Sequence, residues 1–142
     1  MSEIERNKQI IAAIEGAWDS GNLDTLDQHF APSFSSHSAV PGLPAGLAGA
    51  KIAHGMSITA FPDRKVTIEA IYAERDRVSV RTRLTGTNEG GLPWLGAPPN
   101  GKKVNFSSIS IYRLEDGRVV EHWGQNDIGL LMAQLGVAGP TG

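Results

Sequence analysis

The sequence predicts an α+β fold, in which N-terminal helices are followed by an antiparallel sheet. Apolar residues in the N-terminal part recur at the spacing of helices. The second half shows apolar and polar residues in alternation, in runs joined by short turns. Because helical and strand patterns are segregated along the chain, the arrangement is typical of α+β and not of α/β proteins.

Three helices are expected before the first of these strands. Ser2 and Glu5 have capping-box spacing. They precede apolar residues near the helical period, namely Ile4, Ile10, Ile11, Ile14 and Trp18. A short helix is expected over 23–30 and a third over 49–61. Between them, residues 31–47 are rich in Ser, Pro and Gly, which predicts a long loop of the kind that often carries function.

Four strands are expected after the third helix, over residues 65–72, 77–84, 104–114 and 118–125. Asp116 and Gly117 form a hairpin turn between the last two. One face of the strand 104–114 mixes hydroxyls with aromatic rings, from Phe106, Ser108, Ser110 and Tyr112. This face suits a pocket lining, although a solvent-exposed face would alternate in the same way. An antiparallel sheet that curls over helices leaves a cone open at one end, a natural small-molecule site.

Composition narrows the class of protein. A chain of 142 residues is expected to form one domain, over residues 1–142. Its net charge of -2 gives no indication that it binds nucleic acid or an anionic membrane. The absence of cysteine excludes disulfides, thiolate nucleophiles and zinc-thiolate sites, and fits a cytoplasmic location. The four histidines lack the spacing of a metal site, so no metal is expected.

The end of the last strand, Glu121-His122-Trp123-Gly124-Gln125-Asn126-Asp127, is the richest in chemistry. Asp127 lies next to the apolar residues that follow it. Partial desolvation would raise the pKa of its carboxyl and suit it to proton transfer near neutral pH. The same residue could instead cap the segment that begins at Ile128, since Asp is a favoured N-cap.

Several short phrases occur in one order along the chain. They are Pro44-Ala45-Gly46, Gly49-Ala50-Lys51, Ala60-Phe61-Pro62-Asp63, Gly86-Thr87-Asn88-Glu89-Gly90, Gly96-Ala97-Pro98-Pro99-Asn100-Gly101, Tyr112-Arg113, Asp116-Gly117-Arg118, Glu121-His122-Trp123, Asp127 and Gln134-Leu135-Gly136. Together these phrases resemble the SnoaL-like polyketide cyclase (ester cyclase) family, within the superfamily named after nuclear transport factor two. The resemblance extends from about Asn7 to Gly136.

This resemblance implies a conical barrel, in which a curved antiparallel sheet wraps three helices around a deep apolar pocket. It implies a polycyclic polyketide substrate of the anthracycline type, with no metal and no organic cofactor. The aspartate matching Asp127 would be the general acid/base of an intramolecular aldol closure. The family commonly associates through the outer face of its sheet, so a homo-oligomer is expected.

One departure from the family keeps other functions open. Some of these cyclases carry a histidine where this chain has Ser110, and a hydroxyl cannot hold a proton at neutral pH as imidazole can. Hydroxylation of a polyketide ring, an activity of pathway relatives, is therefore the main alternative. A non-catalytic binding module and a hydrolase or isomerase on the same cone are further alternatives.

The remaining site residues are expected as follows. His37 would stand near the mouth of the pocket as a second acid/base. Trp123 would share a face with Asp127 and form a pocket wall, while His122 would pack against a helix. Trp94 is the candidate lid. Lining residues would be Ser108, Ser110, Tyr112, Phe106 and His54, with Trp18 and Phe61 as walls or core.

Overall fold

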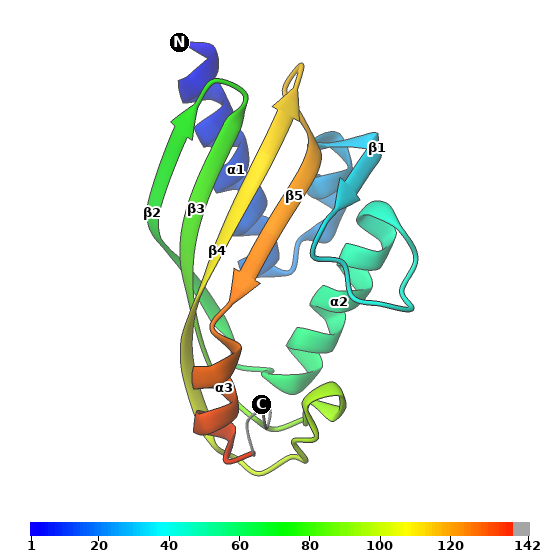
Figure 1. Cartoon of the computed structure of the whole chain (residues 1–142), viewed down its shortest axis with the longest axis vertical. Helices are drawn as coiled ribbons and strands as arrows, with labels where there is room; N and C mark the ends of the chain where they lie inside the picture. The colour runs from blue at the N-terminus through cyan, green and yellow to red at the C-terminus, as the bar shows by residue number, and fades with distance from the viewer. Residues whose placement is uncertain (138–142) are drawn as a thin grey trace.

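A computed structural model describes residues 1–137. In chain order its elements are α1 (Glu3–Ser20), η1 (Leu23–Gln28), β1 (Phe30–Ser36), α2 (Gly46–Ala60), β2 (Lys65–Glu74), β3 (Arg77–Thr87), η2 (Pro93–Leu95), β4 (Lys103–Glu115), β5 (Arg118–Asn126) and α3 (Ile128–Leu135). The strands form one curved, open sheet in the order β1-β5-β4-β3-β2, with α1 and α2 on its concave side (Figure 1). The predicted α+β class is confirmed.

The loop predicted over residues 31–47 is partly wrong, because residues 31–36 belong to β1, which begins at Phe30, and residues 46 and 47 begin α2. This strand pairs in parallel with β5, whereas β2 to β5 pair antiparallel as expected. Only Phe30 and Phe34 of β1 are buried, and Pro32 lies between them. Two buried residues in a stretch rich in Ser and Pro give little of the alternation that marks a strand. Pairing with β5, distant in sequence, is what forms it.

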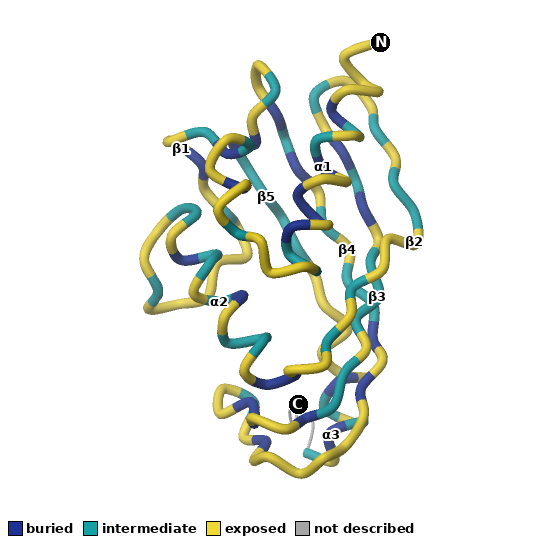
Figure 2. Tube along the Cα trace, turned by 180° about the vertical axis from the view of Figure 1, so that it is seen from behind, coloured by how far each residue is buried: buried dark blue, intermediate teal, exposed yellow. Residues whose placement is uncertain are grey.

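The first helix follows the sequence pattern closely. The Ser2 hydroxyl accepts a hydrogen bond from the Glu5 backbone N–H at 3.1 Å. The helix ends where Gly21 adopts a left-handed φ of 79°, which glycine tolerates without strain. Its buried stripe, with Ile11 and Ile14 fully buried, faces the sheet (Figure 2).

Two clusters of buried apolar residues hold the fold together. One joins α1 and β1 to the sheet and includes Ile11, Tyr112 and Leu114. The other joins the ends of α2 and α3 to β4 and includes Phe61 and Phe106. On the inner face of β4, Ser108 and Ser110 lie between Phe106 and Tyr112 and belong to neither cluster. The interruption between the two cores leaves room for a cleft.

Among residues 1–137, no helix is long and apolar enough to cross a membrane.

Gly49 is a close-contact position between α2 and the chain that precedes it. A Cβ at Gly49 would lie 1.8 Å from the Pro44 carbonyl oxygen, whereas one at Gly55 of the same helix would meet nothing within 4 Å. We expect Gly55→Ala to stabilise the protein by about 1 kcal/mol through helix propensity. Gly49→Ala should instead lower the free energy of unfolding, because the backbone at Pro44 must move to make room for the new Cβ. Urea denaturation of both variants checks this, and an equal gain in stability would contradict the close contact.

Candidate active site

A cleft lies between α1, α2, the loop 38–44 and the concave face of the sheet. It consists of two adjoining hollows with volumes of about 740 Å³ and about 890 Å³, each counted with part of its opening. They share the residues Trp18, Ala50, Ala53, Tyr112 and His122. We call the first the apolar half and the second the polar half.

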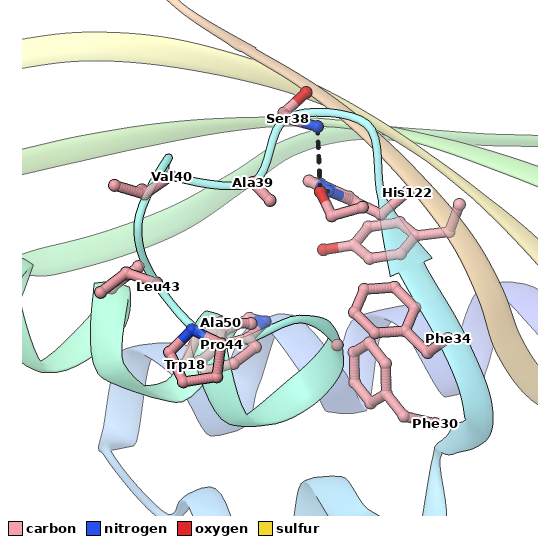
Figure 3. Close-up of a pocket in the computed structure, with 15 residues that line it drawn as sticks. Trp18, Phe30, Phe34, Ser38, Ala39, Val40, Leu43, Pro44, Ala50 and His122 are labelled. Atoms are coloured by element: carbon pink, nitrogen blue, oxygen red, sulfur yellow. Dashed lines mark hydrogen bonds between the residues drawn. The ribbon is translucent and has the colours of Figure 1, made fainter.

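The apolar half is built from β1, α2 and the loop between them (Figure 3). Phe30 and Phe34 pack edge to face with their ring centroids 4.7 Å apart. Val40, Leu43 and Pro44 extend the wall from the loop. Such a surface suits a flat apolar ligand, which would bury ring area against aromatic and aliphatic side chains.

The polar half contains a buried carboxyl group that the sequence analysis did not single out. The Tyr112 hydroxyl donates a hydrogen bond to Glu15 Oε1 at 2.8 Å, joining β4 to α1. Burial raises the pKa of the Glu15 carboxyl, while the Tyr112 hydrogen bond and the charge of Arg64 oppose the rise. Burial likewise raises the pKa of Tyr112 well above its usual value, and Glu15 adds to the effect. The phenol therefore stays protonated, and Glu15 is a stronger base than a solvated carboxylate.

His122 continues this polar chain across the cleft. Its Nε2 lies 3.1 Å from the Ser110 Oγ and its Nδ1 lies 2.9 Å from the Ser36 Oγ. Burial lowers the pKa of His122 to about 4, and the charge of His37 adds to this effect. The ring is therefore neutral near pH 7, with one nitrogen donating and the other accepting. His122 thus links Ser36 on β1 to Ser110 on β4, and its ring packs on Tyr112 with a centroid distance of 4.9 Å.

His54 and Arg64 lie at the other side of the polar half. The His54 ring packs on Trp18 with a centroid distance of 5.0 Å. Arg64 Nη1 donates to the Trp18 carbonyl oxygen at 3.1 Å and lies 3.0 Å from His54 Nδ1. Burial, with a further contribution from Arg64, lowers the pKa of His54 to about 4. This imidazole is also neutral near pH 7.

Five of the predicted site residues line the cleft: Trp18, His54, Ser108, Ser110 and Tyr112. Phe61 and Phe106 do not, because both are buried in the second core. Phe106 shares the inner face of β4, but that face passes beyond the cleft and under α3. Trp94, the predicted lid, lies half exposed in η2 and contributes to neither hollow.

The expectation of a desolvated Asp127 carboxyl is wrong. Asp127 is exposed and lines neither hollow. It is the N-cap of α3, where its Oδ1 accepts a hydrogen bond from the Leu130 backbone N–H at 3.2 Å. Strand β5 ends at Asn126, so the alternation of faces does not extend to Asp127. The structure therefore shows the capping role that the sequence left open.

The expected places of Trp123 and His122 are reversed. His122 pairs with Tyr112, Gly124 with Ser110 and Asn126 with Ser108, so these residues of β5 face the cleft. Trp123 faces outward, where the ring of His37 stacks on it at 4.8 Å.

His37 also lies outside the cleft, contrary to its expected place at the mouth. Its Nε2 is 2.8 Å from the Glu121 Oε2, on the outer side of β5. The backbone N–H of His37 donates to the His122 carbonyl oxygen at 2.8 Å, which extends the pairing of β1 with β5. This pairing carries the side chain away from the cleft.

Sequence reasoning missed Glu15, Arg64 and Asn126 of the polar half. A signal for Glu15 was present: it lies between Ile14 and Trp18 on the apolar stripe of α1, where a carboxylate is out of place. Arg64 carries no comparable signal, since it follows the end of α2 in an irregular segment. Within the described part of the chain, no three His, Asp or Glu residues cluster to hold a metal ion.

The lowered pKa values of His54 and His122 predict acid sensitivity. A histidine whose pKa falls from 6.5 to about 4 on folding stabilises the protein fully above about pH 6.5. That contribution is lost as the pH falls from about 6.5 to about 4, because the unfolded chain binds protons in this range that the folded protein does not. We expect His122→Asn, which cannot be protonated, to lose less stability between these limits than the wild type. Urea unfolding across this range checks it, and parallel losses would contradict it.

Comparison with known proteins agrees with this architecture. A family model described as SnoaL-like polyketide cyclase matches residues 8–135. No curated protein sequence matches the chain. The structure of AclR, a candidate hydroxylase from Streptomyces galilaeus, is 28% identical with a TM-score of 0.81, covering 94% of this chain and 98% of its own.

Two further structures are similar. IdmH, a candidate polyketide cyclase from Streptomyces antibioticus, is 31% identical with a TM-score of 0.79, covering 92% of this chain and 99% of its own. TsrD from Streptomyces laurentii, at 24% identity and a TM-score of 0.85, covers 97% of this chain and 100% of its own, and shares the fold. With the family model extending over nearly all of the described residues, the chain belongs to the SnoaL-like polyketide cyclase family.

Proposed function

We propose that the protein is a cofactor-independent enzyme that closes a ring in a polycyclic, anthracycline-type polyketide by an intramolecular aldol addition. The observation that carries this proposal is the buried Glu15 carboxyl, hydrogen-bonded to Tyr112 beside an apolar cleft. A base with a raised pKa next to a ring-binding surface is what carbon acid chemistry requires.

In this reaction the Glu15 carboxylate takes a proton from a carbon that lies between two carbonyl groups. The resulting enolate carbon forms the new C–C bond with a second carbonyl carbon of the same molecule, whose oxygen becomes an alkoxide. The protonated Glu15 carboxyl then returns its proton to that alkoxide, which completes the step and restores the carboxylate. Tyr112 holds the carboxyl in place, since its hydroxyl remains protonated and donates to Glu15 Oε1.

Hydroxylation of a polyketide ring is the second candidate. It is favoured by the likeness to AclR, named as a candidate hydroxylase, at 28% identity. Ser110 also favours it, because the hydroxyl cannot hold a proton as the histidine of some relatives does. Ring closure needs no dioxygen and hydroxylation does, so product formation with and without dioxygen separates the two.

We propose that copies of the chain associate through the outer face of the sheet. Tyr72, Ile111 and Trp123 lie in one row across that face, and Ile109 is 50% exposed beside it. Apolar side chains in such a row would gain from burial against a second copy.

A charge in this row tests the association. We expect Ile111→Lys to give a smaller particle than the wild type in sedimentation velocity. Ser79→Lys, in the same row on the neighbouring strand, should have the same effect. A wild-type protein that sediments as a single chain at every concentration would contradict the proposal.

Glu15 is the residue whose replacement tests the proposed chemistry. Glu15→Gln keeps an acceptor for Tyr112 but cannot take a proton, so we expect turnover of an anthracycline-type polyketide substrate to fall by about 100-fold or more. Asp127→Asn is the matched control, since Asn is an equally good N-cap and α3 is preserved. We expect its turnover to stay near that of the wild type.

The two variants decide between the carboxyl groups. Both should unfold cooperatively, which circular dichroism confirms before the rates are compared. If Asp127→Asn lost turnover and Glu15→Gln kept it, the role would return to Asp127. If neither variant changed the rate, the acid/base mechanism would be wrong for this protein.

A further inference from the structure

Arg64 brings a positive charge to the polar half of the cleft without an ion-pair partner. Among residues 1–137, no carboxylate oxygen lies within 4.0 Å of its guanidinium nitrogens. Asp19 and Glu15 act on it only at longer range. Asp19 instead accepts a hydrogen bond from the Val66 backbone N–H at 2.7 Å.

The hydrogen-bonding capacity of this guanidinium is only partly used. The contacts of Nη1 with the Trp18 carbonyl oxygen and with His54 account for its two protons. Nε is buried and has no partner among the described residues. Nη2 donates to none of the described residues either, yet it is not buried. Buried charges are normally paired with an opposite charge and fully hydrogen-bonded. The half-buried guanidinium of Arg64, which lies beside the cleft, has neither form of stabilisation in full.

Apart from Glu15, the groups that line the polar half around Arg64 supply no negative charge. His54 is neutral near pH 7, and Thr82, Ser108 and Asn126 are uncharged. The Glu15 carboxylate acts on Arg64 only at longer range and forms no ion pair with it. The polar half thus has room for an anionic group, while the adjoining apolar half has room for rings.

We propose that Arg64 forms an oxyanion subsite, which selects substrates that carry a carboxylate or an equally delocalised oxyanion at the polar end of a flat ring system. This inference rests on the proposed function, whose substrate class it narrows. Nη2, which is not buried and donates to none of the described residues, would give such an anion a charge-assisted hydrogen bond. In the aldol step the same group would stabilise negative charge that develops on a carbonyl oxygen near Glu15.

Two matched probes test the subsite: anthraquinone-2-carboxylate and its neutral methyl ester, titrated by calorimetry at pH 7. We expect the wild type to bind the carboxylate at least about 10-fold more tightly than the ester, as a charge-assisted contact would give. Arg64→Gln should abolish this preference by weakening only carboxylate binding. Arg81→Gln is the control, because Arg81 lies on the outer face and pairs with Glu69 at 3.6 Å.

The outcomes separate the subsite from the proposed function. Equal binding of the two probes to the wild type, or a preference that survives in Arg64→Gln, overturns the subsite alone. If the wild type binds neither probe, the proposal that the substrate is a flat ring system is contradicted as well. Arg64→Lys keeps the charge without the Nη2 donor and should retain a reduced preference; a preference as large as that of the wild type would overturn recognition by the guanidinium. The turnover of Glu15→Gln does not depend on either probe.

Discussion

The hydrogen bond from Tyr112 to Glu15 is the contact on which the site depends. It joins the central strand β4 to α1 at the boundary between the first core and the cleft. A buried carboxyl is tolerated because this hydrogen bond and the nearby Arg64 charge partly offset the cost of desolvation. The residual cost leaves the carboxyl with a raised pKa, and this makes it a usable base. The contact that packs α1 against β4 therefore also sets the basicity of Glu15.

The cleft exists because the sheet packs against two separate groups of helices. α1 covers one end of the inner face, and the ends of α2 and α3 cover the other. Between them, Ser108 and Ser110 present hydroxyls where a continuous core would need apolar side chains. The cleft therefore combines an apolar half beside β1 with a polar half beside β4. A ligand that fills it would need rings at one end and polar groups at the other.

The alternation along β4 and the apolar stripe of α1 were readable from the sequence, because both are local periodic patterns. They placed Ser108, Ser110 and Tyr112 on the cleft side correctly. The alternation failed at the end of β5, where it was counted from Asp127. That residue lies beyond the strand and caps α3, so the face given to Trp123 was the wrong one. An error of one residue in a strand exchanges its two faces.

By itself the sequence determined the α+β class, the first and third of the expected helices, the four antiparallel strands, the family and one wall of the cleft, since these follow from patterns within short segments or from phrases along the chain. Tertiary structure alone decided that β1 forms, because its pairing with β5 joins residues far apart in the chain. It also decided which carboxyl is desolvated. Glu15 and Asp127 are chemically similar side chains, and only the packing of α1 against the sheet withdraws the first from water while the second stays exposed.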